Sequence, residues 1–148
     1  MNSEKRTDPF KNWNRFTALV RSKLKQLENS SDWSGLEEKE QELLALWKLE
    51  TAIQDAGFLH FFCNGGNACF LYARRGLLKM GATQSLEIID KQYAIICRTT
   101  EHYFDITLQN IPLFLTEEEK EKIQDLDHEY RKNSGAVRGV IVRFYEKG

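Results

Sequence analysis

The chain has 148 residues, of which 41% are hydrophobic and 29% charged, and its 21 basic residues nearly balance its 22 acidic ones. This size and composition predict one compact domain over residues 1–148, with a buried core. The near-neutral balance argues against a general binder of nucleic-acid phosphates, and the apolar stretches are far shorter than the ~20 residues that cross a bilayer. We therefore expect neither nucleic acid nor a membrane as a direct partner.

The cysteines and histidines give little sign of reactive chemistry. Three cysteines without a Cys-x-x-Cys pair are typical of reduced thiols in a cytoplasmic protein. His60 and Cys63 lie three residues apart, the minimum for an activated thiol, but no third group accompanies them. The three histidines are too scattered to indicate a metal site. We expect no enzyme activity, no metal and no cofactor.

Charge is segregated along the chain. Residues 28–55 hold eight acidic and two basic residues, and residues 116–130 hold seven acidic and two basic ones. Residues 1–27 and 131–148 are net basic in turn. Two interpretations stay open: solvated helix faces that pair with each other, or two acidic surfaces offered to a basic partner.

The pattern of apolar residues in the first half of the chain predicts two amphipathic helices. Asp8 and Pro9 form a typical helix start. The apolar residues that follow at spacings of three and four are Phe10, Trp13, Phe16, Val20, Leu24 and Leu27. After a polar break at residues 29–32, a second, acidic helix is marked by Leu36, Leu43, Leu44, Trp47 and Ile53 and ends near Gly57.

The stretch GFLHFFCNGGNACF, residues 57–70, predicts a packed helical turn between two helices. Phe58, Phe61 and Phe62 have the spacing of core residues on one helix face. The sequence Asn-Gly-Gly-Asn at residues 64–67 predicts a turn, because glycine adopts positive φ without strain.

The second half continues the helical pattern. A helix is predicted to end at Gly81 as a left-handed cap, and another covers residues 83–98. Thr116 and Glu119 predict a capping box for a third, whose buried side carries Ile123, Leu126 and Tyr130.

Two segments are ambiguous. Residues 101–115 fit a helix extension, an apolar loop or a short strand, and we treat them as irregular or strand-like. The tail around Val137 and Ile141 fits a helix better than a strand. The predicted fold is all-α, a compact bundle of about six helices.

Two stretches carry a family resemblance: LETAIQDAGFLHFFCN at residues 49–64 and LLKMGA at residues 77–82. The matching positions are Ile53, Gly57, Phe58, Phe61, Phe62, Asn64, Gly81, Leu126, Asp127 and Tyr130, while His60 replaces a family glutamine. Over about residues 43–132 the chain thereby resembles a bacterial DNA-mimic protein family.

The resemblance implies a protein-binding regulator, and a homodimer is one of its implications. The acidic helices would occupy the basic surface of a DNA-binding protein. The candidate contact residues are Glu37, Glu38, Glu40, Glu42, Glu117, Glu118, Glu119 and Glu121. Two alternatives stay open: an antitoxin-like immunity protein that neutralises a toxin, and an uncharacterised enzyme with His60 and Cys63 in a pocket.

Overall fold

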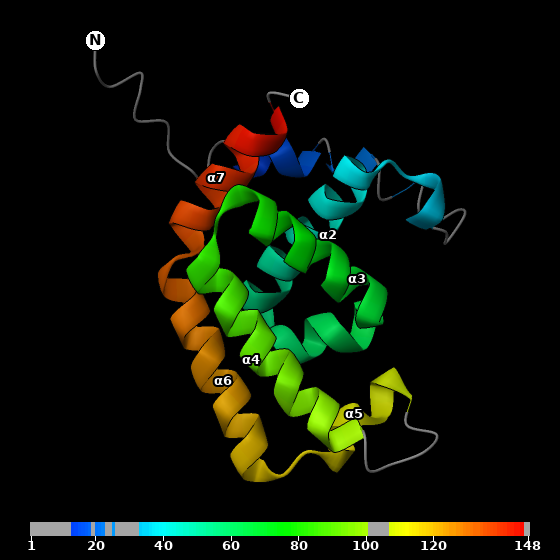
Figure 1. The fold of residues 1–148 in the computed structure, drawn as a ribbon, viewed down its shortest axis with the longest axis vertical. Coiled ribbons are helices and arrows are strands. Elements are labelled where there is room, and N and C mark those ends of the chain that lie inside the picture. Colours follow the sequence, from blue (N-terminus) through cyan, green and yellow to red (C-terminus); the bar gives the residue numbers. More distant parts are fainter. Residues whose placement is uncertain (1–12, 19, 23–24, 26–32, 101–106, 147–148) are drawn as a thin grey trace.

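The computed structural model describes residues 13–18, 20–22, 25, 33–100 and 107–146. The described part is all-α, as the sequence predicted, and contains no strand. After helical residues in the range 13–25, the elements are η2 (Trp33–Gly35), α2 (Glu38–Asp55), α3 (Phe58–Met80), α4 (Thr83–Thr100), η3 (Leu108–Asn110), α5 (Ile111–Phe114), α6 (Glu117–Lys132) and α7 (Ser134–Glu146) (Figure 1).

The helices pack in two connected pairs. Helix α2 lies against α3, which is the most extensive contact between elements, and α4 lies against α6. Figure 1 shows α4 and α6 side by side and running in opposite directions, with α7 continuing from the upper end of α6. Helix α7 returns to α2, so that the last described helix lies against the acidic helix α2.

The core confirms the predicted inner faces. Trp13, Phe16 and Val20 are buried, whereas Phe10, Leu24, Leu27 and the predicted helix start at Asp8 and Pro9 lie outside the described residues. The polar break at residues 29–32 also lies outside them.

The aromatic residues of the 57–70 stretch form the centre of the core. Phe58 and Phe62 are 0% and 4% exposed. Phe70 meets Phe58 edge to face, with 6.0 Å between ring centroids, and stacks on Tyr93 of α4 at 4.1 Å. Since aromatic rings bury large apolar areas, this cluster fixes the position of α3 against α4.

Glycines set the course of α3 at both ends and in the middle. Gly57, with φ of 103°, is its N-cap, and Gly81, with φ of 71°, is the predicted left-handed C-cap. The predicted turn at residues 64–67 is a kink at Gly66, with φ of 71° and ψ of −166°, between two helical runs of α3. The corner therefore joins α2 to α3 and bends α3 once.

The predictions for the ambiguous segments fared differently. The expectation of an irregular or strand-like segment is wrong for residues 108–114, which form η3 and α5, whereas residues 101–106 are outside the described part. Pro112 occupies the first turn of α5, where its missing N–H costs no hydrogen bond. The helix predicted for the tail is confirmed as α7.

Candidate functional site on the acidic face of α6

Helix α6 begins with the capping box that the sequence predicts. The Thr116 hydroxyl accepts a hydrogen bond from the Glu119 N–H at 3.0 Å, and the Glu119 carboxylate accepts one from the Thr116 N–H at 2.8 Å. Glu117 forms a 3.4 Å ion pair with Lys120. Glu117 and Glu119 thus have local roles at the helix start, where the helix dipole also favours acids.

The inner face of α6 anchors the corner between α2 and α3. Oδ1 of Asp127 accepts hydrogen bonds from the Phe58 N–H at 3.0 Å and from Nε2 of Gln92 at 2.8 Å. Burial raises the pKa of Asp127, while the hydrogen bonds from Phe58 and Gln92 oppose that shift. The Leu126-Asp127 motif and the Gly57-Phe58 motif therefore meet in space and hold each other.

A second buried group involves Tyr130, the last residue of that motif. Its hydroxyl lies in the interior beside Glu50 of α2, and burial raises the pKa of both side chains. Glu50 forms a 3.0 Å ion pair with Arg138 of α7, whose guanidinium lies 4.7 Å from the ring centroid of Trp13. Since Glu50 and Arg138 are 88 residues apart, no local sequence pattern indicates this pair.

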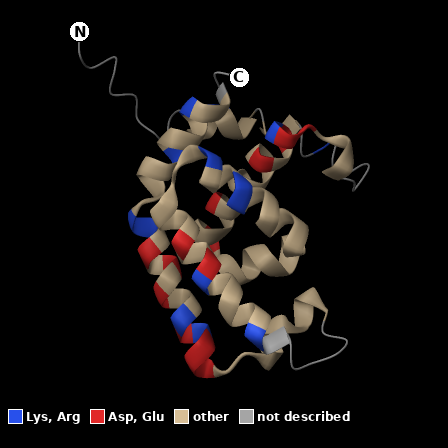
Figure 2. Cartoon of the chain, viewed as in Figure 1, with Lys and Arg blue, Asp and Glu red and all other residues tan. Residues whose placement is uncertain are grey.

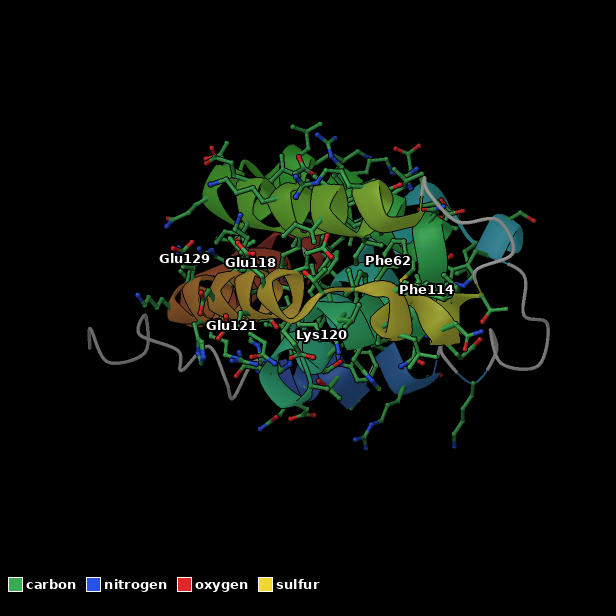
Figure 3. The ribbon with its side chains drawn as sticks, turned by 90° about the horizontal axis from the view of Figure 1, so that it is seen from below. Phe62, Phe114, Glu118, Lys120, Glu121 and Glu129 are labelled. Carbon is green, nitrogen blue, oxygen red and sulfur yellow. The ribbon has the colours of Figure 1, made fainter. Side chains whose placement is uncertain are left out.

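The outer face of α6 carries a stripe of acidic residues. We call it the acidic stripe: Glu118, Glu121, Asp125 and Glu129, all exposed. Their spacing of three, four and four residues places them on the helix face opposite the buried Ile123 and Asp127. Figure 3 shows Glu118, Glu121 and Glu129 along α6, apart from Phe62 in the interior.

Ion pairs do not offset the charge of the acidic stripe within the described part of the chain. None of its four carboxylates has an ion-pair partner there. Glu118 and Glu121 were candidates from the sequence, whereas Asp125 and Glu129 were missed. Their helical spacing from Glu121 was the signal that identifies them.

The acidic cluster of α2 is built differently. Glu38 forms a 2.6 Å ion pair with Lys79 of α3, and Lys79 and Arg75 lower the pKa of Glu38. Glu37 and Glu40 form the capping box of α2. Two cations of α3 thus offset the charge of this cluster.

Glu42, a candidate contact residue from the sequence, does not lie at the surface. Its side chain is 1% exposed and forms ion pairs with Arg75 and, at 2.8 Å, with Lys79. The Tyr145 hydroxyl of α7 also donates to it at 3.2 Å. Glu42 therefore ties α2 to α3 and α7 and is not accessible to a partner.

The corner places its polar motif residues around a small cleft. His60 and Asn64 are exposed and joined by a 2.9 Å hydrogen bond. They border a cleft of about 240 Å³ that Lys48 and Asp55 of α2 also line. Burial raises the pKa of the Cys63 thiol, which disfavours the thiolate that nucleophilic chemistry needs.

The other thiol and metal possibilities are similarly unpromising. Burial raises the pKa of Cys69 to about 12. Within the described residues, no group of three or more histidine, cysteine or acidic side chains is arranged to hold a metal ion. No helix in this part of the chain combines the length and apolarity that a membrane span requires.

The fold and this surface define a class of protein: an all-α domain that, among its described residues, presents an acidic helix face without ion-pair partners. Residues 34–146 match the family model described as DMP19-like protein, and the chain belongs to that family. The match contains the 43–132 region of the resemblance, which is thereby confirmed. No curated protein and no solved structure matches the chain.

Proposed function

We propose that this chain is a non-catalytic protein-binding module of the cytoplasm that occupies the basic surface of a DNA-binding protein through its acidic stripe. Family membership supports a DNA-mimic role. The observation that carries the proposal is the contrast between the two acidic helices. The α2 cluster is offset by Arg75 and Lys79, whereas the four carboxylates of the acidic stripe are exposed and have no ion-pair partner within the described residues.

The spacing of the acidic stripe supports mimicry of a short length of one DNA strand. From Glu118 to Glu129 the helix rises ~16 Å. One strand of B-DNA presents a charge every ~3.4 Å along the helix axis, or about five over that length. The stripe presents four. Since the whole chain has a net charge of only −1, we propose that the imitation is local to α6.

The neighbouring lysines limit the length of this surface. Lys120 pairs with Glu117, and Lys122 is exposed beside the stripe. Figure 2 shows acidic and basic segments alternating along α6. A partner that carries a short basic patch fits this pattern better than one with a long basic channel.

Competition with DNA tests the proposal. The partner is isolated from the native host with the wild-type chain, and its binding to double-stranded DNA is measured with increasing amounts of the chain. We expect wild-type protein to displace the DNA and the E118K/E121K variant to displace it at least tenfold less effectively. The control is D55K, which reverses an exposed carboxylate at the end of α2.

Two outcomes would contradict the proposal. One is a partner that binds DNA and the chain together; the other is a partner with no affinity for DNA. A toxin of the second kind would instead favour the antitoxin-like role. The homodimer implied by the family resemblance stays a prediction, and sedimentation equilibrium of the purified chain tests it.

A further inference from the structure

A groove runs between α4 and α6, beside the acidic stripe. Its volume is about 600 Å³. Helix α4 contributes Lys91, Ala94, Ile95 and Arg98, and α6 contributes Lys122, Asp125 and Leu126. Of these lining residues, Asp125 also belongs to the acidic stripe.

The apolar floor of the groove includes one small residue, Ala94. Ile95 is buried and Leu126 half-buried, whereas Ala94 is exposed. The methyl group of Ala94 lets another backbone come close, because helices approach to 8–10 Å according to the side chains between them. The α4 positions 91, 94, 95 and 98 follow the spacing i, i+3, i+4 and i+7. This is the pattern of a helix face that packs against a further helix.

The charges around this floor are predominantly positive. Lys91, Arg98 and Lys122 line the groove and Asp125 is the one acid among its lining residues. These three cations have no ion-pair partner within the described residues. Arg98 lies in the last turn of α4, where the helix dipole favours a cation, but Lys91 lies in the middle of that helix. A preference for an acidic ligand follows from this arrangement.

We propose that the groove between α4 and α6 binds an acidic amphipathic helix of a partner protein, with apolar residues on the floor of Ala94, Ile95 and Leu126 and carboxylates beside Lys91, Arg98 and Lys122. The α4 stripe from Lys91 to Arg98 rises ~10 Å, which matches about two turns of a bound helix. Three of the four charged lining residues are cations, so this site and the acidic stripe, which share Asp125, select ligands of opposite charge.

Designed peptides of about 16 residues test this site, since shorter helices are marginal in water. One peptide carries a leucine stripe flanked by glutamates, a second has lysines in place of the glutamates, and a third has the glutamates with the leucines scrambled. Binding is followed by the amide resonances of the full-length protein. We expect saturable shifts in residues 91–98 and 122–126 with the first peptide and at least tenfold weaker binding of the other two.

Variants locate the binding in the groove. A94E should weaken the glutamate peptide at least tenfold, because it places a bulky carboxylate on the floor. A68E is the matched control, since Ala68 is an exposed alanine of α3, and should bind as the wild type does. K91E/R98E should prefer the lysine peptide. Thermal unfolding of each variant confirms that the domain is intact.

Several results would overturn the proposal. One is that the glutamate peptide causes no saturable shift. Another is that the lysine peptide or the scrambled peptide binds as tightly as the glutamate peptide. A third is that a folded A94E variant binds the glutamate peptide as the wild type does. A shift of the groove resonances when the protein alone is diluted would assign the groove to a second copy of this chain and would also overturn it.

Discussion

At individual positions, the backbone at Gly57 and the carboxylate of Asp127 depend on each other. Gly57 has φ of 103° and ψ of 173°, a conformation in which a side chain is strained. A Cβ atom there would also collide with Oδ2 of Asp127. The absence of a side chain at Gly57 lets Asp127 reach the Phe58 N–H. This N–H lies at the start of α3 and has no hydrogen-bond partner within the helix.

The three positive-φ glycines at the two caps and the kink of α3 should therefore differ in their tolerance of alanine. G81A meets no atom within 4 Å and should cost ~1 kcal/mol of unfolding free energy from its left-handed backbone alone. G66A adds a contact with Leu108 at 3.2 Å and should cost ~2 kcal/mol. G57A should cost ~3 kcal/mol or more, because strain and collision combine.

Urea unfolding of the three variants measures this order. A double variant separates the two causes at Gly57: G57A/D127A should lose less stability than the sum of the single changes, because removing the carboxylate relieves the collision. Equal costs for G57A and G81A would contradict this account of the corner.

Asp127 should also make stability depend on pH. Burial raises its pKa in the folded state above the ordinary value of 3.8, so the folded state binds its proton more tightly than the unfolded state does. The free energy of unfolding should therefore fall as pH rises from about 4 through the raised pKa, by ~1.4 kcal/mol for each unit of the shift.

D127N should remove this contribution while keeping an oxygen for the Phe58 and Gln92 hydrogen bonds. The measurement is urea unfolding of both proteins at a series of pH values. The wild-type protein should lose stability relative to D127N as pH rises from about 4 through the raised pKa of Asp127. The buried Glu50 is present in both proteins and cancels in the comparison. Parallel curves of unfolding free energy against pH would show that folding does not raise the pKa of Asp127.

Among the helices, Glu42 and Glu38 occupy one face of α2 but have different surroundings. Glu42 is buried and contacts α3 and α7, whereas Glu38 is exposed and, among the described residues, forms its ion pairs with α3. E42Q leaves Arg75 and Lys79 without their buried partner. It should cost ~2–3 kcal/mol of unfolding free energy, below the full penalty because both cations are partly exposed and regain water.

E38Q is the matched control for this prediction. It removes the same charge from the same helix and from the same cations, but at an exposed position, where ion pairs contribute little. Its effect on thermal unfolding should be clearly smaller than that of E42Q. Equal effects would mean that Glu42 does not hold α2 against its neighbours.

Local patterns in the sequence predicted the ends of helices well where residues close together in the chain determine the geometry. The capping box at Thr116 and the left-handed cap at Gly81 were predicted because each depends on neighbouring residues only. The helical turns at residues 108–114 were not predicted, since the aromatic and β-branched residues around Pro112 also suit strands and loops.

The contacts between distant residues could not be predicted in this way. In the sequence, Glu50 and Arg138 resemble ordinary solvated charges, and Glu42 resembles the other acids of its helix. Their burial depends on elements far away in the chain, which no local pattern indicates. The acidic stripe was half predicted: its first two residues stood out as part of a charge run, while Asp125 and Glu129 required the helical spacing to be followed further.

For the molecule as a whole, net charge conceals opposed surfaces. Acids of α2 are offset by cations of α3, the acidic stripe of α6 forms no ion pair within the described residues, and the groove beside it is lined mainly by cations. Such local fields attract or repel a partner before contact. They therefore affect association rates more strongly than they affect the fold. A near-neutral chain can thus still present a locally acidic face.

The most direct test of the central claim is the association rate of the chain with its captured partner, measured against salt concentration for wild type, E121K and D55K. Both variants change the net charge equally, but only E121K alters the acidic stripe. We predict that E121K associates several-fold more slowly at low salt and with a shallower salt dependence, while D55K follows wild type. Equal slopes for wild type and E121K, or an equal slowing by D55K, would contradict the assignment of the contact surface to α6.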